Sequence, residues 1–124
     1  MNVAVWVLQV LLGIVFVGHA YLLLRPPASV QSGMNYILEM PAGLRLFAGL
    51  AEGLAGLALV IPPLLHVATW LTPLAAAGLV VLMLGAIVFH IQRREYPNVG
   101  FNAVLGVLAA VVAWAGSGPT PSSR

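Results

Sequence analysis

Glu52 is the residue whose type and position point most clearly to chemistry. It is a single carboxylate in an otherwise uncharged stretch, residues 46–57, within a segment long enough to cross a lipid bilayer. A carboxylate at that depth costs several kcal/mol unless it is protonated, paired or hydrated. Because ionisable residues at this depth are rare and usually functional, Glu52 is predicted to have a compensating partner and a functional role.

Two sets of residues combine polar and small side chains at helical spacing. The first set is Arg45, Gly49, Glu52 and Gly56, and the second is Asn102, Gly106, Ala109 and Ala113. Residues three or four positions apart lie on the same face of a helix. In lipid, small residues let helix backbones approach closely, and polar residues face a neighbouring helix rather than acyl chains. Both faces are therefore predicted to point into a helix bundle.

The remaining chemical groups are few. The chain has no cysteine, aspartate or lysine, which leaves three glutamates, three histidines and five arginines. Without cysteine the chain itself cannot perform thiol–disulfide chemistry or bind a metal through thiolate. No metal site is predicted.

Each candidate residue also has a purely structural explanation. Glu52 could be a protonated or Arg45-linked carboxylate that only holds the bundle together. Arg45 could extend to lipid headgroups. His19 could be a simple donor between helices, His90 a solvated interfacial histidine, and Asn102 a polar link between helices. The clustering of these residues is more informative than any one of them.

The composition shows which elements must position these groups. Hydrophobic residues make up 61% of the chain and charged residues 6%, against roughly 25% charged residues in a soluble domain. One helical crossing needs about 20 apolar residues, so 124 residues allow four spans with short loops and no soluble domain. The predicted fold is all-α: a single four-helix transmembrane bundle, up-down-up-down, over residues 1–116.

Prolines and polar residues mark the predicted ends of the spans. The first span is expected to stop before Pro26 and the second at Pro62-Pro63, because proline removes a backbone donor and clashes with a continuing helix. Thr72 and Pro73 are typical of an N-cap and a first helical position. The predicted spans cover about residues 3–24, 41–61, 72–91 and 99–115, with a disordered tail over 117–124.

The aromatic residues support this threading independently. An up-down-up-down path places the three tryptophans at one membrane face and the three tyrosines at the other. These residues are Trp6, Trp70 and Trp114, and Tyr21, Tyr36 and Tyr96. Tryptophan and tyrosine favour the headgroup level, so the sorting favours four spans.

The arginines predict how the bundle is oriented. Arg25, Arg45, Arg93 and Arg94 all fall on the tyrosine side, whereas the opposite side has Arg124 and the amino terminus. The positive-inside rule then places the arginine-bearing loops in the cytoplasm and both termini outside. The net charge of +2 needs no nucleic acid as partner, because anionic lipid headgroups suffice.

Depth brings the candidate residues together at the cytoplasmic end. His19, His90, Asn102 and Arg45 are predicted within roughly 8 Å of that boundary, and Glu52 roughly 15 Å deep. One polar pocket that opens toward the cytoplasm and is floored by Glu52 would account for all five residues.

Three segments resemble a known family. They are LRLFAGLAEGLAGLALVIP at 44–62, LTPLAAAGL at 71–79 and MLGAIVFH at 83–90. The Gly-x-x-Glu-x-x-Gly pattern ending in proline, and the Thr-Pro-x-Ala-Ala-Ala-Gly-Leu pattern followed by histidine, are its most specific parts. They resemble the DoxX-like family, and the first span matches only in character.

The resemblance implies a four-helix protein of the bacterial or archaeal cytoplasmic membrane. Relatives include the membrane subunit of a thiosulfate:quinone oxidoreductase and a component of a membrane oxidoreductase complex involved in oxidative stress. The resemblance matches the family's glutamate to Glu52 and its third-span histidine to His90. It implies an oxidoreductase partner, although the absence of cysteine argues against a thiol role.

Three hypotheses of different classes follow. The chain could be a redox-associated subunit that binds a quinone-like or other small apolar ligand, with Glu52 and a histidine handling protons. It could be a small proton-coupled exporter, although the small multidrug-resistance proteins carry their buried glutamate in the first span rather than the second. It could be a scaffold that anchors a soluble partner, and self-association stays open. No cofactor is required, and haem between His19 and His90 is disfavoured, because two histidines alone are a weak signal.

Overall fold

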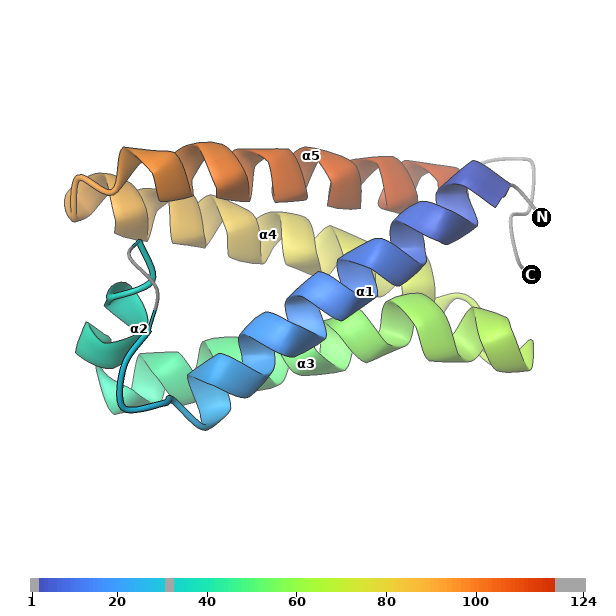
Figure 1. Ribbon diagram of the computed structural model, residues 1–124. Coiled ribbons are helices and arrows are strands. Elements are labelled where there is room, and N and C mark those ends of the chain that lie inside the picture. Colours follow the sequence, from blue (N-terminus) through green and yellow to red (C-terminus); the bar gives the residue numbers. More distant parts are fainter. Residues whose placement is uncertain (1–2, 31–32, 118–124) are drawn as a thin grey trace.

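The described part of the chain, residues 3–30 and 33–117 of a computed structural model, is all-α (Figure 1). It consists of four long helices and one short helix: α1 (Val3–Leu24), α2 (Tyr36–Glu39), α3 (Ala42–Leu65), α4 (Leu71–Gln92) and α5 (Tyr96–Ser117). The long helices alternate in direction, which confirms the predicted four-helix bundle. Of the predicted disordered tail, residues 118–124 lie outside the described residues, and Ser117 is the last residue of α5.

All four long helices are candidate membrane spans by length and apolar composition. Large apolar side chains such as Leu11, Leu54, Leu74 and Val107 are exposed on their outer surfaces. In water such a surface would be unfavourable, whereas in a bilayer it faces acyl chains. The chain is therefore a multi-pass membrane protein.

The long helices pack as two adjacent pairs, α1 with α3 and α4 with α5 (Figure 1). The pairs are joined through α3 and α4, and α1 makes a smaller contact with α5. A core of buried side chains lies between the pairs in the middle and toward the tryptophan end. Its members are Leu12, Phe16, Leu59, Ala76, Leu79, Met83, Leu105, Ala109 and Val112. Toward α2 the two pairs separate, and the core is interrupted there.

Glycines allow α1 and α3 to touch backbone to backbone. A Cβ on Gly13 would lie 3.1 Å from the carbonyl oxygen of Gly56, and a Cβ on Gly56 would lie 3.3 Å from that of Gly13. Farther along, a Cβ on Gly49 would lie 2.9 Å from Leu24 Cδ2, and one on Gly106 would lie 3.3 Å from Met83 Cβ. The predicted inward orientation of the two small-residue faces is confirmed at these positions.

The predicted end of the second span at Pro62-Pro63 is wrong, because α3 continues through both prolines to Leu65. The prolines leave the carbonyls four residues earlier, of Ala58 and Leu59, without their helical donors. Side chains from other helices replace these donors: Thr72 Oγ1 donates to Ala58 O at 2.8 Å, and Gln9 Nε2 donates to Leu59 O at 2.9 Å. The tertiary structure thus supplies what the prolines remove.

These hydrogen bonds predict that a second substitution restores the stability lost by a first. Replacing Gln9 by leucine should lower the free energy of unfolding by about 1–3 kcal/mol, because Leu59 O is left buried without a donor. Adding Pro63→Ala should recover much of the loss, since the new backbone N–H at position 63 lies four residues after Leu59. Thermal or detergent unfolding of the single and double variants would measure this. A double variant no more stable than Gln9→Leu would contradict the explanation.

Other boundaries differ by smaller amounts. Trp70, rather than the predicted Thr72, is the N-cap of α4. The Thr72 hydroxyl donates to Ala58 O instead. The last helix begins at Tyr96, three residues before the predicted start at about 99. The short helix α2 was not predicted. It buries the Tyr36 side chain inside the bundle, at 8% exposure, at the end where the three tyrosines were predicted to lie.

Candidate functional site

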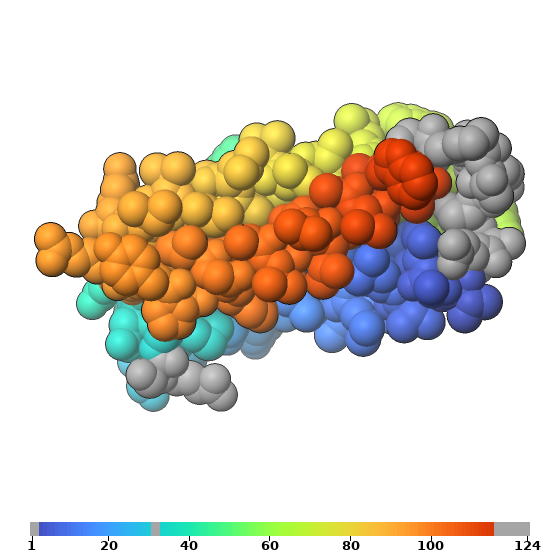
Figure 2. Space-filling view, turned by 90° about the horizontal axis from the view of Figure 1, so that it is seen from above, coloured from blue at the N-terminus to red at the C-terminus, as the bar shows by residue number. Residues whose placement is uncertain are grey.

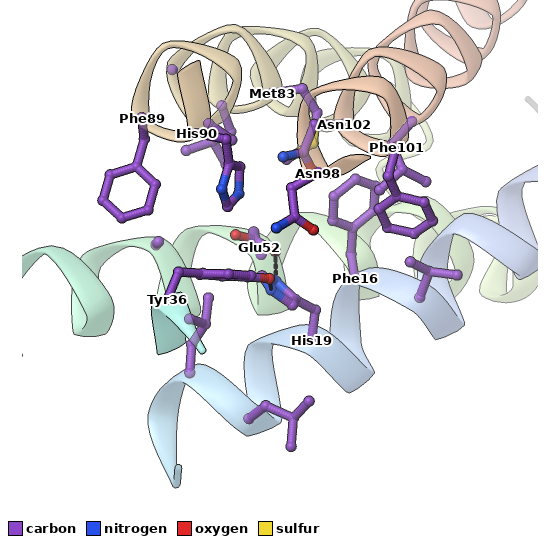
Figure 3. Close-up of a pocket in the computed structure, with 18 of the residues that line it drawn as sticks. Phe16, His19, Tyr36, Glu52, Met83, Phe89, His90, Asn98, Phe101 and Asn102 are labelled. Atoms are coloured by element: carbon purple, nitrogen blue, oxygen red, sulfur yellow. Dashed lines mark hydrogen bonds and ion pairs between the residues drawn. The ribbon is translucent and has the colours of Figure 1, made fainter. Parts of the chain in front are cut away.

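A cavity of about 770 Å³ lies between the two helix pairs at the α2 end (Figure 3). Its walls are mostly apolar and include Phe16, Leu23, Met34, Met83, Phe89 and Phe101. Its polar residues are His19, Tyr36, Glu52, His90, Asn98 and Asn102. A mostly apolar cavity of this size with a few convergent polar groups is typical of a small-molecule site.

Glu52 and His19 form a direct polar contact in the cavity. Glu52 is 5% exposed, and its Oε1 lies 2.7 Å from His19 Nδ1. The second ring nitrogen of His19, Nε2, lies 2.6 Å from the hydroxyl of Tyr36. When Glu52 is ionised, it accepts from Nδ1–H, and Nε2 accepts from the Tyr36 hydroxyl. Three side chains from α1, α2 and α3 thus form one chain of hydrogen bonds that can hold or transfer a proton.

Tyr36 keeps its proton over the physiological pH range. Burial, and then the neighbouring carboxylates of Glu52 and Glu95, raise the pKa of its phenol to about 12. Both effects disfavour a phenolate, the first through lost solvation and the second through like charge. The Tyr36 hydroxyl is therefore a hydrogen-bond donor to His19, whose other ring nitrogen contacts Glu52.

The facing wall carries its own polar groups. His90 from α4, and Asn98 and Asn102 from α5, lie across the cavity from His19 and Glu52 (Figure 3). The ring of His90 meets that of Tyr36 edge to face, with centroids 4.6 Å apart. The two walls therefore present hydrogen-bonding groups to the same space from opposite sides.

A charged cluster at the α4–α5 connection positions His90. Nδ1 of His90 lies 2.8 Å from Glu95 Oε1, and the same oxygen accepts from Arg93 Nε at 2.9 Å. Arg93 also pairs with Glu39 of α2. Burial alone would raise the pKa of Glu95, but the hydrogen bonds from Arg93 and His90 outweigh it and lower that pKa below its usual value. Glu95 thus stays ionised near neutral pH and fixes the orientation of the His90 ring.

Arg45 lies outside the cavity. Its guanidinium donates to the backbone carbonyl of Leu23, in the last turn of α1. Carbonyls in a last turn lack helical donors, and a cation there is stabilised by the helix dipole. This contact directs Arg45 away from Glu52. Within the described residues, the carboxylate of Glu52 therefore pairs with His19 only.

The structure thus brings four of the five predicted site residues, His19, Glu52, His90 and Asn102, around one cavity and leaves Arg45 out. Reasoning from the sequence missed Tyr36 and Asn98. Tyr36 lies in a short helix between two spans, where tyrosine is common at the headgroup level. Asn98 lies one turn before Asn102, at helical spacing, and that spacing could have identified it.

Four apolar spans around a partly polar cavity define a small multi-pass membrane protein. The profile of the DoxX-like family matches residues 7–112, so the chain belongs to the DoxX-like family. Comparison with curated proteins and with solved structures gave no match.

Proposed function

We propose that this protein binds a small, quinone-like molecule in the cavity, as a redox-associated subunit of the bacterial or archaeal cytoplasmic membrane. The observation that carries the proposal is the placement of hydrogen-bonding groups on two facing walls of an otherwise apolar cavity. His19, Tyr36 and Glu52 supply one wall, and His90, Asn98 and Asn102 supply the other. A quinone ring has an apolar body and two carbonyls at opposite ends, which matches this pattern.

The site residues would manage protons rather than electrons. Reducing a quinone to a hydroquinone takes two electrons and two protons, and the side chains of this cavity supply no electrons. The Glu52–His19–Tyr36 chain of hydrogen bonds can donate or accept a proton at one carbonyl. The electrons would come from, or pass to, an oxidoreductase partner.

Direct binding tests the proposal, with two tryptophan substitutions on α3 as a matched pair. Ala48 lines the cavity, whereas Ala51, three residues later, lines the outer groove between α3 and α4. The parent in lipid nanodiscs should bind a short-tailed benzoquinone in equilibrium dialysis. Ala48→Trp should weaken binding at least tenfold by filling the cavity, and Ala51→Trp should leave it unchanged. Equal binding by the parent and Ala48→Trp would show that the quinone binds elsewhere.

The orientation is part of the proposal. The arginine-bearing loops would face the cytoplasm and both termini the outside. Because the chain has no cysteine, single cysteines report each face: Ser29→Cys beyond α1, and His66→Cys at the end of α3, both at exposed positions. An impermeant thiol reagent added to intact cells should label position 66 and spare position 29. The reverse pattern would overturn the orientation.

The exporter hypothesis would use the same Glu52, but a transported molecule must reach both faces of the membrane. The packed core around Leu59, Leu79 and Ala109 lies between the cavity and the tryptophan end. This supports a binding site with one closed end. Proton-driven uptake of a cationic dye by proteoliposomes would favour the exporter instead, and a lack of both binding and transport would favour the scaffold.

A further inference from the structure

The α2 end of the cavity is covered on the side of the headgroups. Tyr36 and Ile37 of α2 are buried there, and the Arg93–Glu39 ion pair ties α2 to the α4–α5 connection. Asn98 Nδ2 donates to Gly33 O at 2.8 Å, which ties the segment before α2 to α5. In the space-filling view, the α2 segment (cyan) lies against the beginning of α5 (orange) (Figure 2). The predicted opening of the pocket toward the cytoplasm is thus covered by this short helix.

The lateral sides of the cavity, between neighbouring long helices, differ from the covered α2 end because they reach the outer surface. A residue that lines the cavity and is also exposed on the outer surface marks a place where the cavity meets the exterior. Such residues form two groups: Ile14, Val15, Gly18 and Phe101 on α1 and α5, and Leu44, Phe47, Val81 and Gly85 on α3 and α4. All of them are apolar or glycine, so both sides are suited to acyl chains and neither is suited to water.

Each side reaches into the hydrocarbon region at one of its glycines. Gly18 lies six residues before the end of α1 at Leu24, and Gly85 lies seven before the end of α4 at Gln92. At 1.5 Å per residue both are about 10 Å inside the ends of their helices. An occupant could therefore enter from the bilayer without passing through water.

We infer that the cavity takes a lipid-soluble amphiphile that enters sideways from the bilayer, between α1 and α5 or between α3 and α4. Its hydrogen-bonding head lies against Glu52, His19 and Tyr36, and its long alkyl or isoprenoid tail extends past Gly18 or Gly85 into the acyl chains. This rests on the proposed function and adds to it the class of ligand and its route. A cavity of 770 Å³ holds a substituted ring and the first part of a tail, so a longer tail must leave by a side.

Larger side chains at Gly18 and Gly85 would narrow the two lateral sides of the cavity without a clash at Cβ. A Cβ added at Gly18 or Gly85 would meet nothing within 4 Å, and the same holds for Gly100, which is exposed on α5 and does not line the cavity. The Gly18→Phe/Gly85→Phe double variant should bind a decyl-tailed benzoquinone in nanodiscs at least tenfold more slowly than the parent. Association of the tail-less ring should be slowed less than that of the tailed quinone, because the ring leaves no tail in the narrowed sides. Gly100→Phe should leave both rates unchanged. Undiminished association of the tailed quinone with the double variant would overturn lateral entry.

A measurement without added ligand separates this inference from the proposed function. A bimane label on Ala48→Cys, the only thiol in the chain, reports what reaches the cavity. Lipids with nitroxide on their acyl chains should quench it, and the double phenylalanine variant should reduce that quenching several-fold. Quenching by aqueous iodide and not by the nitroxide lipids would overturn lateral entry even if a quinone binds. Quenching by the lipids without any quinone binding would support lateral entry and leave only the quinone proposal overturned.

Discussion

Glu52→Gln should weaken hydroquinone binding while leaving the fold intact. An ionised Glu52 accepts a charge-assisted hydrogen bond from a hydroquinone hydroxyl. Glutamine keeps a carbonyl oxygen for His19 Nδ1–H but carries no charge. The variant should therefore bind about 10–100-fold more weakly, because a charge-assisted hydrogen bond has become a neutral one.

Glu95→Gln is the matched control for this measurement. Glu95 belongs to the charged cluster outside the cavity lining, where it contacts His90 and Arg93. Its replacement should shift the affinity only modestly, through the position of His90. Equilibrium dialysis of a short-tailed hydroquinone, kept reduced, would give the affinities of both variants in nanodiscs. An unchanged affinity for Glu52→Gln would leave Glu52 a structural carboxylate.

Gly56→Leu should destabilise the bundle more than any other single change considered. A Cβ at Gly56 would lie 3.0 Å from Val17 Cγ2, 3.3 Å from Phe16 Cβ and 3.3 Å from the carbonyl oxygen of Gly13. The carbonyl cannot move without moving α1, so leucine must push the α1–α3 pair apart. We expect a loss of about 3 kcal/mol, at the upper end for an overpacked core site, in addition to any hydrogen bonds broken as the helices separate.

Gly78→Leu is the control for that change. Gly78 is exposed on α4, and a Cβ there would meet nothing within 4 Å. Replacing it should be neutral or stabilise the helix by up to about 1 kcal/mol, since glycine is a poor helix former. Thermal unfolding in the same detergent compares the two variants with the parent. Equal stability of Gly56→Leu and Gly78→Leu would mean that the close contact of α1 and α3 contributes little.

The site follows from the way in which the two helix pairs meet. Close contacts at Gly13 and Gly56 hold α1 and α3 together, and the shared core joins the two pairs away from α2. At the α2 end the pairs separate, and polar residues from both of them face the resulting cavity. A carboxylate there is tolerated because His19 provides a hydrogen bond and a positive charge when protonated. Separation of the pairs and placement of Glu52 are therefore parts of one arrangement.

Local properties of the chain were enough to predict the spans and the inward faces. Each span is an apolar run of bilayer length, and this property needs no knowledge of neighbouring helices. The positions of Gly49, Glu52 and Gly56 on one face follow from the period of the helix, and all three are buried. The same reasoning placed His19, His90 and Asn102 at one depth, which is why they line one cavity.

Long-range partners decided what the sequence alone could not. Pro62 and Pro63 would end an isolated helix, yet α3 continues because Gln9, 50 residues before Leu59, supplies one missing donor and Thr72 supplies the other. Arg45 shares a face with Glu52, but the unpaired carbonyl of Leu23 draws it away. Tyr36 reaches His19 only because α2 folds over the cavity. Spacing along one helix determines which residues share a face, whereas the partner of a buried polar group depends on where separate helices place their free donors and acceptors.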